Sequence, residues 1–294
     1  MKKKLVVLAG LILVLTASAT AFSFSDMFGT ETGKVALVQL SGTITPSSSG
    51  FSTGGITPSK VRELNRKVES GNYDAVIYEI NSGGGAVVAS KEIKRSIEKV
   101  SVPTVCRFRD VSASGAYLIS TGCDKIVADS ATMTGSIGVT SSYLSFSEAI
   151  ENYGIDYINI SAGKYKEMGS RFSNMSEKEK KIMENMAENI QEEFISIVDK
   201  SRNLTSKEEK KIETARIFLG DEAKNLSLVD KLGGRSTAIE VAEELSGKDE
   251  LKVEKVETVQ EFNLMSMFLS ETGIKAFLDI FSAQGVEVPL KAEL

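Results

Sequence analysis

The stretch DAVIYEINSGGG, Asp74–Gly85, shows the unit from which this protein is built. Asp74–Ile80 is a short apolar run rich in β-branched residues, which is typical of a buried strand. Three glycines end the run, and the residues at about Val87–Val100 are expected to form a helix. The segment PTVCRF, which follows, is strand-like again. A strand, a glycine turn, a helix and a second strand predict a βαβ unit with parallel strands.

The same alternation extends in both directions from this stretch. Val35–Ile44 is a β-rich run, and Thr57 with Pro58 is a strong helix start. Further on, KIVAD and DYINI are strand-like, TMTGSIGV is a glycine-punctuated turn and strand, and SFSEAIENYG is helix-like. Ser176-x-x-Glu179 is a capping box that opens one long helix, whose apolar stripe indicates packing. The sequence predicts an α/β domain with a mainly parallel sheet covered by helices.

Composition narrows the function classes. The 294 residues carry a formal net charge of −5, so the basic excess typical of nucleic-acid binding is missing and no nucleic-acid partner is expected. The chain has no histidine, which excludes a Ser-His-Asp triad and a Cys-His dyad within it. Two cysteines alone cannot build a structural zinc site, and we expect neither metal nor cofactor.

The N-terminus has the features of an export signal. Three lysines precede Leu5–Phe22, a run of 18 uncharged residues, and alanines near its end offer cleavage sites. Residues 1–25 are therefore expected to be a cleaved signal peptide or a retained single-span anchor. The rest of the chain would then be extracytoplasmic, at the cell membrane or secreted. We expect a linker over 26–34, the main domain over 35–248, and a helical C-terminal extension over 249–294. Three roles are open for this extension: packing on the domain, contact with another subunit, or contact with a membrane.

The two cysteines would share a compartment that permits disulfides. Cys106 lies in the strand-like TVCRF and Cys123 in the apolar ISTGCDKIV. These surroundings favour the interpretation that both are small buried apolar side chains.

Two serines stand at a junction between a strand and a helix-like segment, in DVSASGAYLISTG. A serine there either caps the helix or attacks a carbonyl. Ser112 fits a helix cap better. Ser114 would lie near the positive end of the helix dipole, and the N–H of Gly115 could face a developing oxyanion. The glycines of INSGGG, among them Gly84 and Gly85, could likewise hold an oxyanion or a phosphate, or form a plain turn.

A catalytic serine in this chain needs a base other than histidine. Lysine can serve if burial makes its amine neutral, since a free lysine titrates near ~10.4. Lys164 and Lys166, in SAGKYKEMGS, follow a strand-like segment and would point in opposite directions if extended. Spacing alone does not choose between them.

Together these segments resemble the signal peptide peptidase A family of serine peptidases, family S49. The family's Asn-Ser-Pro-Gly-Gly turn corresponds to Asn81–Gly85, and its Ala-Ser-Gly-Gly-Tyr corresponds to Ala113–Tyr117. Thr134–Val139 keeps the family's Thr-Gly-Ser-Ile-Gly-Val, and Ala162–Glu167 resembles its lysine segment. Gly220–Gly234 matches a further glycine-rich motif, with Ser227 in place of one glycine. Gly83 stands in place of the usual proline, Ala116 in place of a glycine and Glu167 in place of an aspartate.

The resemblance implies a fold and a set of roles. The fold would be the crotonase/Clp-protease type, a ββα superhelix with a mainly parallel sheet. Ser114 would be the nucleophile, Lys166 the general base and Ser136 a helper serine that orients the lysine. Gly85 and Gly115, with Gly84 as a further candidate, would supply the oxyanion N–H groups. Serine and lysine would come from one fold unit, and subunits would form a homo-oligomeric ring.

The function that follows is a membrane-associated serine endopeptidase with a Ser/Lys dyad. It would degrade remnant signal peptides and other short or unfolded apolar peptides on the extracytoplasmic side. Two alternatives remain beside it: a catalytically inactive extracytoplasmic scaffold of the same fold, and a crotonase-type acyl-transfer enzyme. The export signal disfavours the second, because coenzyme A chemistry is cytoplasmic.

Overall fold

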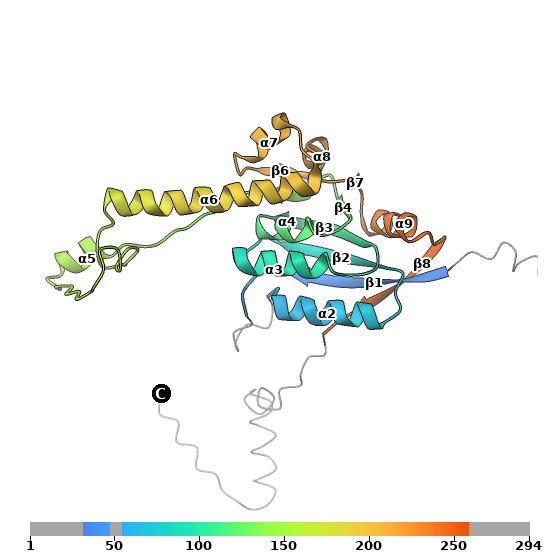
Figure 1. Ribbon diagram of the computed structural model, residues 1–294, viewed down its shortest axis with the longest axis horizontal. Helices are drawn as coiled ribbons and strands as arrows, with labels where there is room; N and C mark the ends of the chain where they lie inside the picture. The colour runs from blue at the N-terminus through green and yellow to red at the C-terminus, as the bar shows by residue number, and fades with distance from the viewer. Residues whose placement is uncertain (1–31, 48–54, 259–294) are drawn as a thin grey trace, which may run out of the picture. The chain divides into compact units, whose positions relative to one another are not determined.

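A computed structural model describes residues 32–47 and 55–258 of the chain. Within them, eight strands form one sheet in the order β6-β5-β3-β2-β1-β8, with β4 beside β3 and β7 beside β4. All pairs are parallel except β5 with β6. The predicted α/β class and mainly parallel sheet are therefore confirmed (Figure 1).

The elements alternate along the chain as the sequence pattern predicts, apart from the differences described below. In chain order they are β1 (Thr32–Ser41), α2 (Pro58–Ser70), β2 (Ala75–Ser82), α3 (Val87–Ile97), β3 (Thr104–Ala113), α4 (Gly115–Ser120), β4 (Lys125–Ala128), β5 (Met133–Gly135), α5 (Ser147–Asn152), α6 (Glu177–Arg202), α7 (Ser206–Ile212), β6 (Ile217–Leu219), α8 (Gly220–Asn225), β7 (Lys231–Leu232), α9 (Arg235–Ser246) and β8 (Glu250–Val256).

Both faces of the sheet are covered by helices, which explains why its central strands are apolar throughout. On β2, Val76, Tyr78 and Ile80 belong to a core shared with α2, α3, α4 and α6. Ala75 and Ile77 belong instead to a smaller core formed with α9. Alternate residues of one strand thus serve two cores.

Helix starts agree with the capping signals. Thr57 caps α2, and its hydroxyl accepts a hydrogen bond from the Lys60 N–H. Ser176 and Glu179 form the predicted capping box of α6, with both reciprocal hydrogen bonds present. These side chains satisfy N–H groups that have no partner inside the helix.

Two predicted elements differ in the structure. Strand β3 continues through Ser112, which pairs with Ser82 and Thr134, so the helix begins only at Gly115. The predicted strand DYINI, residues 156–160, has no pairing in the described chain. It belongs to a segment of residues 140–175, here called the arm, that leaves the sheet after Val139 and returns at the start of α6 (Figure 1). A strand needs a neighbouring ladder, and the arm finds none there.

The domain is longer than residues 35–248. Strand β1 begins at Thr32, and β8 pairs with it from Thr32↔Glu250 to Val38↔Val256, inside the segment predicted as a helical extension. The predicted signal or anchor, residues 1–25, and residues 259–294 lie outside the described residues. No helix in the described ranges has the length and apolar character needed to cross a bilayer.

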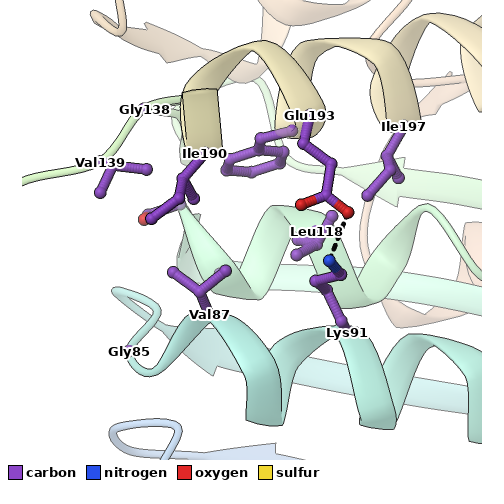
Figure 2. Close-up of a pocket in the computed structure, with 12 residues that line it drawn as sticks. Gly85, Val87, Lys91, Leu118, Gly138, Val139, Ile190, Glu193 and Ile197 are labelled. Atoms are coloured by element: carbon purple, nitrogen blue, oxygen red, sulfur yellow. Dashed lines mark hydrogen bonds and ion pairs between the residues drawn. The ribbon is translucent and has the colours of Figure 1, made fainter. Parts of the chain in front are cut away.

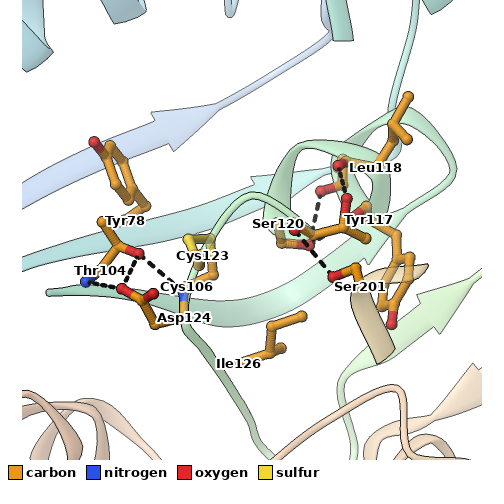
Figure 3. Close-up of a disulfide and its surroundings, with 12 residues drawn as sticks. Tyr78, Thr104, Cys106, Tyr117, Leu118, Ser120, Cys123, Asp124, Ile126 and Ser201 are labelled. Atoms are coloured by element: carbon orange, nitrogen blue, oxygen red, sulfur yellow. Dashed lines mark hydrogen bonds between the residues drawn. A yellow bond between two sulfur atoms is a disulfide. The ribbon is translucent and has the colours of Figure 1, made fainter. Parts of the chain in front are cut away.

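Cys106 and Cys123 form a disulfide, with their Cα atoms 5.8 Å apart. The interpretation as two unlinked apolar side chains is therefore wrong, although both are buried. Cys106 is on β3 and Cys123 follows α4, so the bridge closes a loop that contains Ser114 and the whole of α4 (Figure 3). Sequence context could not reveal this, because the chain reversal between β3 and α4 brings the two cysteines together.

Removing this bridge should destabilise the domain. The cysteines are 17 residues apart, and a loop of about that size is worth roughly 3 kcal/mol of unfolding free energy. We expect Cys106→Ala/Cys123→Ala to lower the urea midpoint accordingly, and reductant to do the same to the wild type. Two free thiols in the unfolded, unreduced wild type would contradict the bridge.

A buried carboxylate ties the sheet to α9. Glu79, 1% exposed, accepts hydrogen bonds from Arg235 at 2.9–3.1 Å, from Arg107 at 3.2 Å and from Gln39 at 2.9 Å. Burial alone would raise the pKa of this carboxyl, but the hydrogen bonds from Gln39 and Arg235 and the two positive charges together hold it below its ordinary value.

Glu79 should therefore matter for stability and for its pH dependence. Glu79→Ala leaves the mostly buried Arg107 without its carboxylate partner, and we expect a loss of about 3 kcal/mol in unfolding free energy. Because the folded-state pKa is lowered, the stabilisation is complete above the unfolded value near 4.5 and is lost as the pH falls through the folded value. Urea titrations at pH 7 and below pH 4.5 measure both effects. A variant as stable as wild type at pH 7 would refute this account.

Candidate active site

Ser114 occupies the turn between β3 and α4 with an unusual backbone conformation. Its φ of 53° and ψ of −126° are rare for a residue with a side chain, and such strain costs of order 1–3 kcal/mol. The turn is held by the Ser114 N–H, which donates to the Gly135 carbonyl at 2.8 Å, and by the Leu118 N–H, which donates to the Ser114 carbonyl at 3.0 Å. The hydroxyl makes no capping hydrogen bond. A sharp strand-to-helix turn of this kind exposes a nucleophile.

The glycine turn after β2 lies directly against Ser114. A Cβ on Gly84 would be 2.7 Å from the Gly115 nitrogen and 3.0 Å from the Ser114 Cβ. A Cβ on Gly115 would be 3.2 Å from the Gly85 nitrogen. Gly84 also has φ +101°, which favours glycine. Only residues without side chains allow the two turns to approach this closely.

Of the three predicted oxyanion donors, one N–H group is already hydrogen-bonded and two are free within the described residues. The Gly84 N–H already donates to the Ser82 hydroxyl at 3.1 Å, so it is not free to bind an oxyanion. Within the described chain, neither the Gly85 N–H nor the Gly115 N–H has a hydrogen-bond acceptor. Gly85 and Gly115 thus present two available donors next to the Ser114 hydroxyl, which is what a developing oxyanion requires.

Ser136 lies at the same end of the sheet. It follows β5, whose Gly135 binds the Ser114 N–H, and its own N–H donates to the Arg216 carbonyl at 3.0 Å. Its φ of 49° is again unusual for a residue with a side chain. Gly135, the residue before Ser136, is therefore in direct contact with Ser114. The role of Ser136 as a helper serine stays a prediction.

A narrow pocket lies beside Ser114. Figure 2 shows several of the residues that line it. Its walls come from the first turns of α3 and α4, from the segment after β5 and from α6. The lining residues are Gly85, Val87, Lys91, Ser114, Gly115, Leu118, Gly138, Val139, Ile190, Glu193, Phe194 and Ile197. Mostly apolar walls beside a serine and two free N–H groups favour contact with an uncharged side chain of an acyl donor.

The family model for peptidase family S49 matches residues 96–249, slightly more than half of the chain. The chain belongs to this family. The "Putative protease slr0021" of Synechocystis is 34% identical over 230 residues, which cover 78% of this chain and 79% of that protein. The resemblance to the signal peptide peptidase A family is confirmed.

Other S49 relatives match over a smaller share of their length. The "Putative signal peptide peptidase SppA" of Enterococcus faecium is 34% identical, over 60% of this chain and 53% of its own. "Protease 4" of Haemophilus influenzae is 29% identical, over 88% of this chain and 43% of its own. This chain therefore spans about half the length of these two relatives.

Two solved structures show a similar course of the chain at low sequence identity. A mutant of the 1510-N membrane-bound stomatin-specific protease, in complex with a substrate peptide, has a TM-score of 0.49 and 15% identity, covering 81% of this chain and 98% of that one. A ClpP1 mutant from Listeria monocytogenes has a TM-score of 0.45 and 16% identity, covering 69% and 93%. Likeness at this level carries no conclusion about function.

Lys166, the lysine that the S49 resemblance selects, does not line the pocket at Ser114. It lies in the arm, its side chain is exposed, and its N–H donates to the Gly163 carbonyl at 3.1 Å. In this structure one fold unit thus brings together Ser114 and the free N–H groups of Gly85 and Gly115, without the lysine. The pairing of Lys166 with Ser114 stays a prediction.

The local sequence predicts that Ser112 caps a helix, and this prediction is wrong. Ser112 lies inside β3, fully buried, and its hydroxyl has no hydrogen-bond partner in the described chain. The sequence signal was misleading because the strand runs further than its apolar character indicates. Ser114, two residues later, is the one of the pair that lies at the turn.

Sequence patterns offered little indication of the pocket walls. Ile190, Phe194 and Ile197 belong to the apolar stripe of the long helix, which indicates packing, and Phe194 is indeed buried. The same stripe also closes the pocket over α4, and Glu193 joins it there. Helical periodicity shows which residues share a face, but it does not show which part of that face borders a cavity.

Proposed function

We propose that this chain is a serine endopeptidase in which Ser114 is the nucleophile. The observation that carries the proposal is the strained turn at Ser114, with the free N–H groups of Gly85 and Gly115 beside it and a pocket opening there. Membership of a peptidase family supports the same reaction. The fold type that goes with this proposal is the crotonase/Clp-protease type.

The proposed reaction has two halves. Ser114 Oγ attacks the carbonyl carbon of the scissile peptide bond and gives its proton to a base, while the N–H groups of Gly85 and Gly115 bind the oxyanion. The protonated base then donates to the leaving amine as the C–N bond breaks. Water attacks the resulting acyl-serine, and its proton passes through the same base, which regenerates Ser114 and releases the acid.

The base in this proposal is Lys166, oriented by the Ser136 hydroxyl. A lysine accepts a proton only where burial removes its charge, so the exposed arm must become covered for catalysis. The arm carries large apolar side chains that lie in the open, with Tyr153 85%, Ile158 81% and Ile160 95% exposed. Such a surface favours contact with protein, and we propose that assembly into a homo-oligomeric ring covers it.

The proposed substrates are short or unfolded apolar peptides, including remnant signal peptides. The apolar pocket at Ser114 supports this class, because it would hold an uncharged side chain of the acyl residue. We also propose that Leu5–Phe22 attaches the chain to the cell membrane, with the domain on the extracytoplasmic side, or that its removal releases the domain. Mass measurement of the mature N-terminus distinguishes the two.

Turnover of a quenched-fluorescent peptide with apolar residues around the scissile bond tests the proposal. We expect the assembled wild-type protein to hydrolyse it and to leave an acyl-CoA thioester untouched. Hydrolysis of the thioester alone would favour the acyl-transfer alternative. A folded, assembled protein that turns over neither compound would be the inactive scaffold.

A further inference from the structure

An ion pair lies within the wall of the otherwise apolar pocket. The Lys91 ammonium on α3 contacts the Glu193 carboxylate on α6, so the pair joins two helices across the pocket. Figure 2 shows the pair on the side of the pocket away from Gly85 and Gly138. The Lys91 side chain is 23% exposed and the Glu193 side chain 53% exposed.

Helix geometry places this pair one turn beyond the nucleophile. Lys91 follows Val87 by four residues on α3, and Leu118 follows Ser114 by four residues around α4. Residues four apart in a helix lie on one face, separated by about 6 Å along the axis. A side chain that enters at Ser114 would therefore extend about one helical turn before it meets the ion pair.

We propose that the Lys91–Glu193 ion pair determines which side chain the pocket accepts. The pair would contact the side chain of the residue whose carbonyl Ser114 attacks, so the inference rests on the proposed peptidase function. It would restrict the pocket to uncharged side chains. Lys91 and Glu193 act here as specificity residues and take no part in bond breaking.

The restriction follows from the charges. Each charge of the pair is already compensated by the other, so an acidic or basic substrate side chain would meet no free counter-charge in an apolar pocket. Removing one partner creates such a counter-charge. Glu193→Gln would leave the mostly buried Lys91 ammonium to attract an acidic side chain, and Lys91→Met would leave the Glu193 carboxylate to attract a basic one.

The test uses three peptides that differ only in the residue before the scissile bond, which is Leu, Glu or Lys. We expect the wild type to favour Leu. We expect Glu193→Gln to raise kcat/KM for the Glu peptide relative to the Leu peptide by roughly tenfold. Lys91→Met should raise the relative value for the Lys peptide by a smaller factor, because Glu193 is more exposed and water screens its charge.

A matched control comes from the same helix. Glu92 pairs with Arg62 on α2 at 3.4 Å, outside the pocket, so Glu92→Gln also breaks an ion pair between helices. It should leave the peptide preference unchanged. The charge-swapped variant Lys91→Glu/Glu193→Lys restores a pair and should regain the preference for Leu. A purely structural pair would instead lower kcat/KM for all three peptides equally.

Binding separates a failure of this inference from a failure of the proposed function. In a Ser114→Ala background, calorimetry of the uncleaved peptides reports the pocket without turnover. Glu193→Gln should tighten the Kd for the Glu peptide relative to the Leu peptide. If the wild type cleaves no peptide but this shift occurs, the peptidase proposal fails and the pocket assignment stands. An unchanged order of peptides in both measurements would overturn the inference.

Discussion

Ser114→Ala should abolish peptide hydrolysis while leaving the protein folded. We expect kcat to fall by more than about 10,000-fold, because the nucleophile is lost. The Ser90 hydroxyl, which also lies near Gly115, cannot replace it, because it is buried and donates to the Ala86 carbonyl. The Ser114 hydroxyl makes no capping hydrogen bond, so its loss removes no helix stabilisation. Steady-state kinetics and thermal unfolding of the same preparation measure both parts.

Ser112→Ala is the matched control for this variant. It removes a hydroxyl two residues away that is buried and has no hydrogen-bond partner within the described residues. Replacing an unsatisfied buried hydroxyl by hydrogen is close to neutral or stabilising, so activity and stability should stay within the wild-type range. Full activity in Ser114→Ala, or an inactive Ser112→Ala that remains folded, would contradict the assignment of the nucleophile.

Lys166→Ala should have the next largest effect. Loss of a general base costs about 100- to 10,000-fold in kcat. Lys164→Ala, two residues away in the same exposed turn of the arm, is the control and should keep most of the activity. Kinetics of both variants, measured on assembled protein by size-exclusion chromatography with light scattering, separates loss of the base from loss of assembly. Equal activity in the two variants would remove Lys166 from the mechanism.

Mixing the two inactive proteins shows which chain supplies the lysine. Ser114→Ala and Lys166→Ala subunits are co-assembled after mild dissociation and assayed together. Recovered activity means that Lys166 reaches Ser114 of a neighbouring subunit. No recovery in confirmed mixed assemblies means that the arm closes over its own domain. Both results report on the assembled protein, in which we expect the arm to be covered. In the structure described here the arm is exposed.

Local sequence signals were sufficient for the body of the fold. The apolar run before the glycines of Asp74–Gly85 is β2, and α3 begins two residues after Gly85. Thr57 and the Ser176 capping box start their helices as predicted. These features depend on neighbours within four residues, and for that reason a single sequence reveals them.

Features that depend on contacts between distant residues could not be predicted from the sequence. The Cys106–Cys123 bridge depends on how β3 and α4 reverse the chain. The engagement of the Gly84 N–H by Ser82 depends on the shape of the turn. The DYINI segment is unpaired because no strand of the described chain lies beside it, and strand propensity alone cannot supply a partner strand.

The central claim, that Ser114 is the nucleophile, is tested most directly by covalent labelling. The assembled wild-type protein is treated with a fluorophosphonate probe, digested and analysed by mass spectrometry. We predict one adduct per chain, on Ser114, and none in Ser114→Ala. An adduct on Ser112 or Ser136, or a preparation that cleaves peptides but takes up no probe, would contradict the claim.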